Sequence, residues 1–496
     1  RPPLDASARR GAPDRARGRV VVRVQRSAAA LLVAVALAGL GISSRDEPVE
    51  VPSTFASLGN PTMPFVPSGS FITSSWFCPG VPGGEEGVGG SIEITNPADQ
   101  PIAGRVTAYS SEAGAAAVDR PVVVPPRSTT SIELSALQPR GSYVSALVEI
   151  DGGGGFVEQI ARHPAGDAAS ACANAASSNW WFADGFTVDD SSLRLVLTNP
   201  YPDAAIVDIG FVTQDGIRNP GFLQGFPIPG RSVEVIDLPA RDEPLLAARV
   251  VATRGRVVAA RAQHYLGGGR LGYTMTLGAP SLSSQYYFAD GEVGEGVSEQ
   301  YAIYNASDAD VSVFAVFLGL PPTTDFLNDT EIEVAKGDVV VLDTADIEGL
   351  PPGRHGAVFS TFAADSIVVE RILTRPAGDS VATSVVVGSP PNLASTRWSA
   401  SVGTPTPVEA GLVVLNVDSV DTTVTVSTLG PGGLVPVPGL EQIPLPAAGL
   451  ITVPLTDPAV LGRAFVVESG QRLFVERLLP RGDELDGTSG SFPLAG

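Results

Sequence analysis

Three histidines are the residues in this sequence best suited to general acid–base chemistry near neutral pH: His163, His264 and His355. They lie far apart along the chain, and none belongs to an H-E-x-x-H zinc motif or accompanies a G-x-S-x-G serine motif. The two cysteines have no nearby histidine with which to complete a tetrahedral zinc site. We therefore expect no catalytic residues, no metal site and no cofactor, and a protein that is not an enzyme.

An aromatic motif that occurs four times is the strongest candidate for binding. It is centred on Trp76, Trp181, Tyr287 and Trp398, at spacings of 105, 106 and 111 residues. An aromatic ring beside a carboxylate can stack on a sugar and accept hydrogen bonds from it, but burial in a core is the commoner fate of an aromatic residue on a strand. We favour the core interpretation and keep the other open. The candidate binding residues are Trp180, Trp181, Asp184, Tyr286, Tyr287 and Asp290.

Other markers recur with the same period and predict the elements that carry the aromatic motif. An asparagine ends a β-rich run in each copy, and a predicted hairpin closes each copy. Apolar residues alternate with period two, as in strands with one face on a core. A repeat of about 105 residues with short strands is typical of a β-sandwich rather than a propeller blade. We predict an all-β protein of four tandem Ig-like β-sandwich repeats, at residues 72–178, 179–283, 284–394 and 395–496.

A Glu-Arg dipeptide occupies the same place in the last predicted hairpin of two copies, at Glu370-Arg371 and Glu476-Arg477. The counterparts diverge to Glu158-Gln159 and Ala260-Arg261. Adjacent residues on a strand point to opposite faces, so the pair cannot act together as a catalytic dyad. We expect outward-facing ion pairs with neighbouring strands, worth ~0.2–1 kcal/mol each.

Charge and cysteine content limit the class of partner. The net charge of −21 argues against nucleic-acid binding, which requires a basic surface. Acidic clusters such as Asp189-Asp190 could hold calcium, but they lack the spacing of an EF-hand loop and are interpreted as solvated loops. The sequence has two cysteines, Cys78 and Cys172, and an even number of cysteines in an exported chain favours a disulfide.

The amino-terminal part predicts export. A basic leader at residues 1–26 precedes the apolar segment 27–43, which contains 15 consecutive uncharged residues from Ala28 to Ile42. This arrangement is typical of a signal peptide or a single membrane anchor helix. The basic flank is expected to stay in the cytoplasm, and residues 44–71 to form a linker outside the membrane. Membrane contact is expected through residues 27–43 only, and the rest is expected to be extracytoplasmic, either anchored or secreted.

The leader, the sequence WFCPG around Trp76 with its second cysteine, and the WWFADG and YYFADG copies resemble an uncharacterised family of exported actinobacterial proteins. The resemblance implies an envelope location and a repetitive β-architecture, and it provides no catalytic residues. We therefore expect a non-enzymatic cell-envelope scaffold or adhesion-type protein, with four domains in a row, whose partner is an envelope protein or glycan. The alternative is a carbohydrate-binding array that recognises cell-wall glycan.

Overall fold

The computed structural model describes residues 64–320 and 330–496, and these residues are almost entirely β-structure. The leader, the expected signal or anchor segment and most of the expected linker lie outside the described residues. Within the described ranges, no helix is long and apolar enough to cross a membrane. The strands pair antiparallel in several sheets, which confirms the predicted all-β class.

The strands form four units with one shared topology, here called units 1 to 4. In units 1 to 3 one sheet contains the aromatic-motif strand and the other contains the asparagine strand. In unit 1 the first sheet has the order β1-β6-β3-β4 and the second β5-β2-β7-β8. Unit 3 repeats this as β18-β23-β20-β21 and β22-β19-β24-β25, and unit 2 follows the same order with one extra short strand.

The elements have the following bounds. Unit 1 contains β1 (Thr73–Pro82), β2 (Gly89–Asn96), β3 (Ile102–Ser110), β4 (Val118–Val124), β5 (Ser128–Glu133), α2 (Leu134–Leu137), β6 (Tyr143–Asp151), β7 (Phe156–Arg162) and β8 (Ala168–Ala171). Unit 2 contains β9 (Asn179–Phe182), β10 (Ser192–Asn199), β11 (Ala205–Thr213), β12 (Gly216–Arg218), η1 (Gly221–Leu223), β13 (Phe226–Ile228), β14 (Ser232–Asp237), β15 (Leu246–Arg254), β16 (Val258–Gly267) and β17 (Arg270–Leu277). Unit 3 contains β18 (Gln285–Val293), β19 (Ser298–Asn305), β20 (Val311–Leu318), β21 (Thr330–Val334), β22 (Val339–Asp343), η2 (Thr344–Asp346), β23 (Gly353–Ser360), β24 (Ile367–Ala377) and β25 (Ser380–Val387). Unit 4 contains η3 (Pro391–Leu393), β26 (Ser395–Ala400), β27 (Val408–Asn416), β28 (Thr422–Gly430), β29 (Gly433–Pro436), β30 (Ile443–Leu445), β31 (Leu450–Leu455), β32 (Phe465–Pro480), β33 (Thr488–Ser491) and β34 (Leu494–Ala495).

Period-two patterning places the cores between the paired sheets. Along β20, Val311, Val313, Ala315 and Phe317 are buried, and the residues between them are half-buried. These side chains join the core of unit 3, and units 1, 2 and 4 each have a corresponding apolar cluster. The alternation seen in the sequence therefore indicates the inward face of the strand correctly.

The repeated asparagine has the same structural role in every unit. Its side-chain Nδ2 donates to the backbone carbonyl four residues later, and its Oδ1 accepts from the backbone N–H two residues later. Nδ2 also donates to a carbonyl about 30 residues further on, which ties the turn to the chain just before β5, β14, β22 and β31 of the four units. These residues are completely buried, and they are Asn96, Asn199, Asn305 and Asn416.

The hairpin predicted at the end of each unit is not formed. In unit 1 the two strands of that segment are β6 and β7, and β6 pairs with β1 and β3 while β7 pairs with β2 and β8. The turn between them therefore crosses from one sheet to the other. In unit 4 the chain makes the same crossing without a turn, because β32 runs through both sheets as one continuous strand. Alternation within each strand is the same for both arrangements, so the pattern did not distinguish them.

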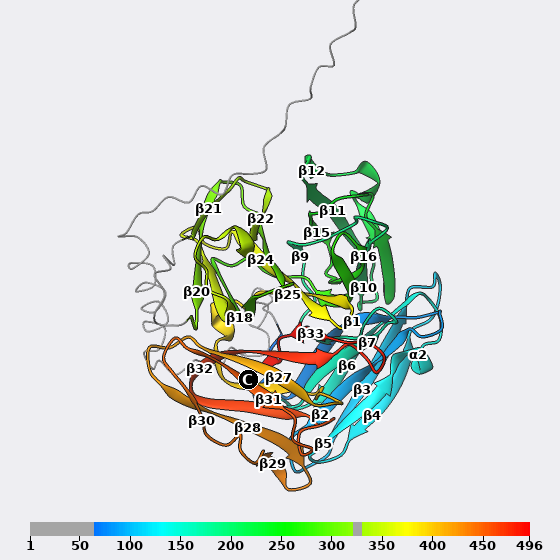
Figure 1. Ribbon diagram of the computed structural model, residues 1–496. Coiled ribbons are helices and arrows are strands. Elements are labelled where there is room, and N and C mark those ends of the chain that lie inside the picture. Colours follow the sequence, from blue (N-terminus) through cyan, green and yellow to red (C-terminus); the bar gives the residue numbers. More distant parts are fainter. Residues whose placement is uncertain (1–63, 321–329) are drawn as a thin grey trace, which may run out of the picture.

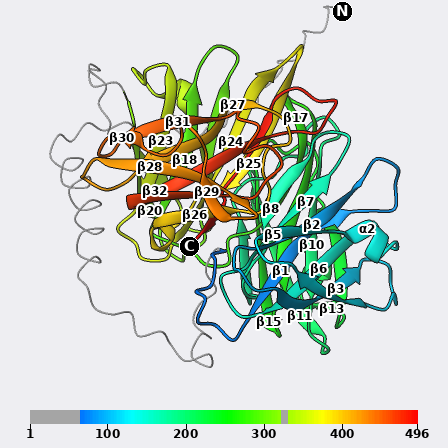
Figure 2. The ribbon, with the colours of Figure 1, turned by 90° about the horizontal axis from the view of Figure 1, so that it is seen from below.

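The four units close into a ring rather than lying in a row. In Figure 1 the chain passes from unit 1 in blue through green and yellow to unit 4 in orange and red, which returns to lie beside unit 1. The equivalent strands β8, β17, β25 and β33 join the units in a cycle, because each contacts the next and β33 contacts β8. Figure 1 shows β25 and β33 near the centre. Figure 2 shows β8 and β25 near the middle of the molecule from a second direction. The expectation of an extended row is therefore wrong.

Candidate functional site

The aromatic motif mostly fills cores. Trp180 and Tyr286 are about 1% exposed, and Tyr287 is buried in a stack on Phe474 of unit 4, with ring centres 4.4 Å apart. The indole Nε1 of Trp180 donates to the backbone oxygen of Val257 at 2.9 Å. None of these three rings can stack on a sugar, because no face is accessible. The burial removes them from the candidate binding surface and supports the core interpretation.

Trp181 differs from its neighbours because its side chain remains partly exposed. It lies between Trp180 and Phe182, which both belong to the core of unit 2, so the alternation of the strand directs Trp181 to the opposite face. There it packs at the edge of an apolar cluster shared by units 2 and 3. Its backbone N–H and C=O both bond to Ala279, at 3.0 and 2.9 Å, so the strand that carries the ring is held on this side.

Asp184 and Asp290 are fully buried and bonded to arginine and tyrosine side chains, so they are not available to a ligand either. Asp184 accepts from the hydroxyl of Tyr265 at 3.1 Å and from Arg270 at 3.4 Å. Asp290 accepts two hydrogen bonds from Arg375, at 2.8 and 3.0 Å. Burial alone raises the pKa of Asp290, but the nearby guanidinium groups, with Arg375 foremost, outweigh it and lower the pKa to about 2.

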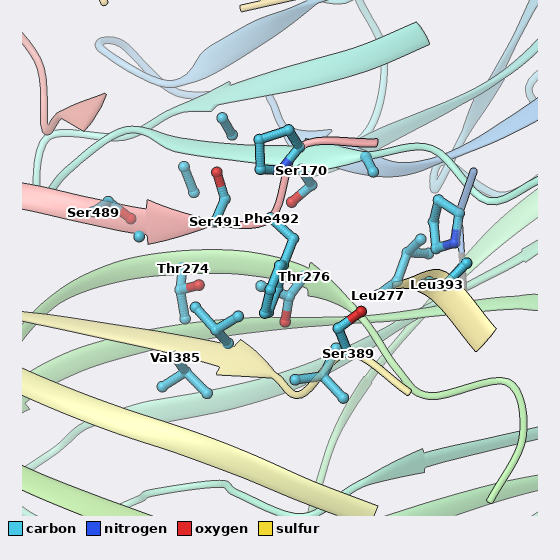
Figure 3. Close-up of a pocket in the computed structure, with 18 of the residues that line it drawn as sticks. Ser170, Thr274, Thr276, Leu277, Val385, Ser389, Leu393, Ser489, Ser491 and Phe492 are labelled. Atoms are coloured by element: carbon cyan, nitrogen blue, oxygen red, sulfur yellow. The ribbon is translucent and has the colours of Figure 1, made fainter. Parts of the chain in front are cut away.

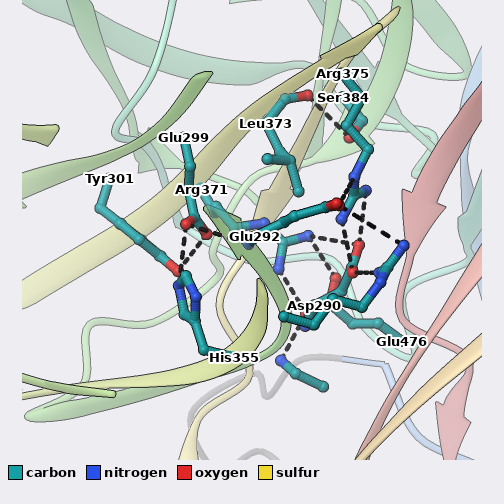
Figure 4. Close-up of polar contacts among 12 residues, drawn as sticks. Asp290, Glu292, Glu299, Tyr301, His355, Arg371, Leu373, Arg375, Ser384 and Glu476 are labelled. Atoms are coloured by element: carbon teal, nitrogen blue, oxygen red, sulfur yellow. Dashed lines mark hydrogen bonds and ion pairs between the residues drawn. The ribbon is translucent and has the colours of Figure 1, made fainter. Parts of the chain in front are cut away.

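The Glu-Arg dipeptides form buried ion pairs between units, which corrects the expectation of outward-facing pairs. The arginine of one unit bonds the glutamate of the next: Arg371 in unit 3 donates to Glu476 in unit 4 at 2.6 and 2.9 Å. Both side chains have no exposed surface, and Figure 4 shows them among the other polar groups of unit 3. The carboxylate of Glu476 also accepts from the backbone N–H groups of Ala289 and Asp290.

The same contact joins units 2 and 3, and it closes the ring between units 4 and 1. Arg261 donates to Glu370 at 2.8 Å. Arg477 donates to Glu158 at 2.6 and 2.9 Å. All of these side chains are fully buried. Each such contact is called a joint here, and three of the four joints contain an ion pair.

In the 1–2 joint both charges are absent, because Gln159 stands in the arginine position and Ala260 in the glutamate position. The Gln159 amide bonds both the N–H and the C=O of Gly80. The glutamate bonds the equivalent N–H in the other three joints, and the arginine bonds the equivalent C=O in the 2–3 and 4–1 joints. Apolar residues of unit 2, including Met275, pack into the core of unit 1 at this joint. The two divergent dipeptides of the sequence therefore meet in one place, where apolar packing and a glutamine replace the ion pair.

The backbone contacts of the joints also correct the alignment of the aromatic motif by one residue. Glu370 accepts from the N–H of Asp184, and Glu158 accepts from the N–H of Val402. Asp184 and Val402 are therefore equivalent, and Val402 lies four residues after Trp398. The residue four positions before Asp184 is Trp180, so Trp180 and, in unit 3, Tyr286 correspond to Trp76 and Trp398, rather than Trp181 and Tyr287. The first aromatic residue of each motif is therefore a core residue in every unit.

Two of the histidines lie together across the 1–2 joint. The ring of His163 in unit 1 stacks on Tyr273 of unit 2 at 4.3 Å and makes an edge contact with His264 at 4.7 Å. Burial, together with the charge of His264 and Arg194, lowers the pKa of His163 to about 4, and burial also lowers the pKa of His264. Both are neutral at pH 7 and serve as packing groups.

The third histidine, His355, is buried in unit 3, and its Nε2 lies 3.0 Å from Glu299, whose other carboxylate oxygen accepts from Tyr301 at 2.7 Å. This arrangement is visible in Figure 4. Among the described residues, no serine or threonine hydroxyl is hydrogen-bonded to a histidine ring. In the same part of the chain, no group of three or more His, Cys, Asp or Glu side chains could hold a metal ion.

Cys78 and Cys172 form the predicted disulfide, which confirms that pairing. Beside it, the backbone of Phe77 bonds in both directions with Ala173, at 2.7 and 2.8 Å. The bond therefore ties the first strand of unit 1 to the segment that follows its last strand. Disulfides persist in oxidising compartments, which is consistent with a location outside the cytoplasm.

Three hollows are lined by residues of more than one unit or of the segments that link the units. The axial pocket has a volume of about 90 Å³ and is lined by all four units, with hydroxyl groups from Ser170, Thr274 and Ser491 and apolar surface from Val385 and Phe492 (Figure 3). A larger hollow of about 400 Å³ is lined by Trp181 and by segments that precede units 2, 3 and 4. We call it the Trp181 hollow.

A third hollow of about 360 Å³ has one lining residue in common with each of the other two. It shares Asn392 with the Trp181 hollow and Leu393 with the axial pocket, and Phe65 and Ala495 also line it. Phe65 and Ala495 form a parallel bridge, so the beginning of the described chain and its carboxyl end lie side by side here. The hollows therefore lie along the segments that link the units and at the place where the ring is closed.

Residues 158–270 match a family of unknown function (DUF5719). The matched stretch begins at Glu158, the glutamate of the 4–1 joint, and ends at Arg270, the first residue of β17. The resemblance to an uncharacterised family is confirmed for this stretch. No curated protein and no solved structure matches the chain.

Proposed function

We propose that this protein is a non-enzymatic binding scaffold of the cell envelope, located outside the cytoplasm of the actinobacterial cell that the sequence resemblance implies. The observation that carries the proposal is the fully buried Arg477–Glu158 pair, which joins the last unit to the first. A closed ring holds its linking segments in fixed positions, and such preorganised surfaces bind without a large loss of conformational freedom.

The polar chemistry of the described residues supports a structural role for the charged groups. The buried carboxylates named in the joints are bonded to arginine side chains and backbone N–H groups of a neighbouring unit. The histidines of the 1–2 joint have pKa values below neutral pH, and they pack against a tyrosine. The disulfide and the expected leader support export. Envelope proteins or glycans are the proposed partners.

Co-sedimentation with isolated cell envelopes tests this function. The purified full-length protein should sediment with envelopes from the native host, and Arg477→Met, which removes the buried ion pair between units 4 and 1, should reduce the bound fraction severalfold. Arg397→Met is the matched control, because Arg397 pairs with Glu468 on a partly exposed surface. Prior protease digestion of the envelopes distinguishes a protein partner from a glycan. Absence of sedimentation, or reduced cysteines in protein isolated from cells, would overturn the proposal.

A further inference from the structure

We propose that the Trp181 hollow binds one sugar unit of a glycan. This inference rests on the binding function proposed above and specifies the class of ligand. The first support is the ring itself. Among the four tryptophans of the sequence, Trp76, Trp180 and Trp398 are at most 1% exposed, whereas Trp181 is partly exposed and lines a hollow. A rigid aromatic face at the wall of a hollow is suited to stacking on the apolar face of a pyranose ring.

The second support is the polar lining. Asn179 lies two residues before Trp181 on β9, so both side chains leave the same face of the strand. The carboxylate of Asp365 and the side-chain amide of Asn392 line the hollow from units 3 and 4, and both residues are exposed. Among the described residues, neither side chain has a hydrogen-bond or ion-pair partner. A carboxylate that accepts and amides that both donate and accept match the hydroxyl groups of a sugar.

The third support is the backbone at Asp365, which has a left-handed φ of 46°. Val257 and Ile367 form equivalent bridges to Ser177 and Ser283, so the residue of unit 2 that corresponds to Asp365 is Gly255. Gly255 also has a positive φ, of 77°, a conformation that glycine adopts without strain. Unit 3 thus places a carboxylate at a position where the backbone favours glycine, and strained positions of this kind occur at ligand sites.

The volume and construction of the hollow agree with a ligand of this size. A volume of about 400 Å³ lies within the range of small-molecule sites. Because its lining comes from β9, from the β23–β24 turn and from the segments before units 2, 3 and 4, the hollow exists only when these units are docked together. The carboxylate of Asp365 does not require a positively charged ligand, because hydroxyl groups of a neutral sugar can donate hydrogen bonds to its oxygens.

Titration of the full-length protein with chitotetraose and with cellotetraose tests the site, because the first carries acetamido groups and the second carries hydroxyl groups only. Binding is followed by calorimetry and by tryptophan fluorescence, in which the response to ligand should come from Trp181 because the other indoles are buried. At least one oligosaccharide should bind, and Trp181→Ala should weaken its affinity by about tenfold or more.

Two further variants separate a binding role from a structural one. Asp365→Gly introduces the residue that unit 2 uses, so the fold should be retained while affinity falls by about tenfold, as expected for a lost hydrogen bond to a charged group. Tyr201→Ala removes an exposed aromatic residue of unit 2 outside the hollow and should leave affinity unchanged. Binding of neither oligosaccharide, or binding that both hollow variants leave unchanged, would overturn the inference. If the protein still sediments with envelopes in that case, the scaffold function stands without this site.

Discussion

The guanidinium of Arg477 and the carboxylate of Glu158 are joined by two hydrogen bonds although 319 residues separate them in the chain. Their fully buried contact closes the ring between its last and first units. A buried pair of this kind contributes little net stability compared with apolar packing, but removal of one partner leaves the other charged and desolvated. The joints are therefore the places where single substitutions should have the largest effects.

Arg477→Met should lower the free energy of unfolding by about 3–5 kcal/mol, because Glu158 is left buried without its partner. The double variant Arg477→Gln with Glu158→Ala copies the 1–2 joint and should recover most of the loss. Urea unfolding followed by circular dichroism measures both. Arg397→Met, at a partly exposed pair, should change stability by less than about 1 kcal/mol. A double variant as unstable as the single one would contradict the equivalence of the joints.

The disulfide should stabilise unit 1 through the unfolded state. Replacing Cys78 and Cys172 together by alanine should lower the free energy of unfolding by about 4–5 kcal/mol, since the bond closes a loop of 94 residues. Calorimetry of the oxidised and alanine forms measures the difference. Peptide mass spectrometry without reduction should recover the linked peptides from protein isolated from cells, and free thiols there would argue against export.

Substitution of the repeated asparagine should be costly in every unit. Asn305→Asp keeps the shape of the side chain but replaces Nδ2, which donates to carbonyls including Ala309 and Val334, by an acceptor. Each unsatisfied buried carbonyl costs about 1–3 kcal/mol, and a carboxylate introduced there adds charge repulsion. Thermal unfolding should show a clear drop in Tm, and Asn392→Asp, at an exposed position, should not shift it. Equal effects of the two variants would refute a structural role.

Stability should depend on pH through the histidine pair of the 1–2 joint. The pKa of His163 is about 4 in the folded protein and 6.5 in the unfolded chain. Between these pH values the unfolded chain therefore binds more protons than the folded protein. The free energy of unfolding is therefore highest, as far as His163 is concerned, above pH 6.5, and it decreases as the pH falls towards 4. The double variant His163→Gln with His264→Gln should show a flatter dependence of Tm on pH in this window. An unchanged slope would show that the pair does not titrate as described.

The sequence predicts the strands well because their patterning is local. The alternation along β20 depends only on neighbouring residues and indicates the buried face correctly, and Asn305 ends β19 as the end of the β-rich run predicts. The sequence did not predict the sheet to which each strand belongs. β6 and β7 have the composition of a hairpin, and only their pairing with distant strands separates them.

The joints were missed for a related reason. A glutamate beside an arginine on one strand gives no indication that their partners lie in other units. One signal was present in the sequence: the two defective copies of the dipeptide, Glu158-Gln159 and Ala260-Arg261, lack an arginine and a glutamate respectively. If the arginine of each unit is paired with the glutamate of the next, both losses fall on a single contact, and the remaining three contacts are intact.

Closure also makes the number of repeats a structural constraint. In an open repeat array each unit touches only its neighbours, so units can be added or deleted with little effect on the others. Here deletion of unit 3 would require Arg261 of unit 2 to pair with Glu476 of unit 4. Three units would then have to meet at different angles from four, and the contact between Arg477 and Glu158 could not form as it does now. Unequal recombination between copies, the common route by which repeat genes lengthen or shorten, should therefore yield chains that cannot close. Such a protein is expected to change by divergence within its four units rather than by change in their number.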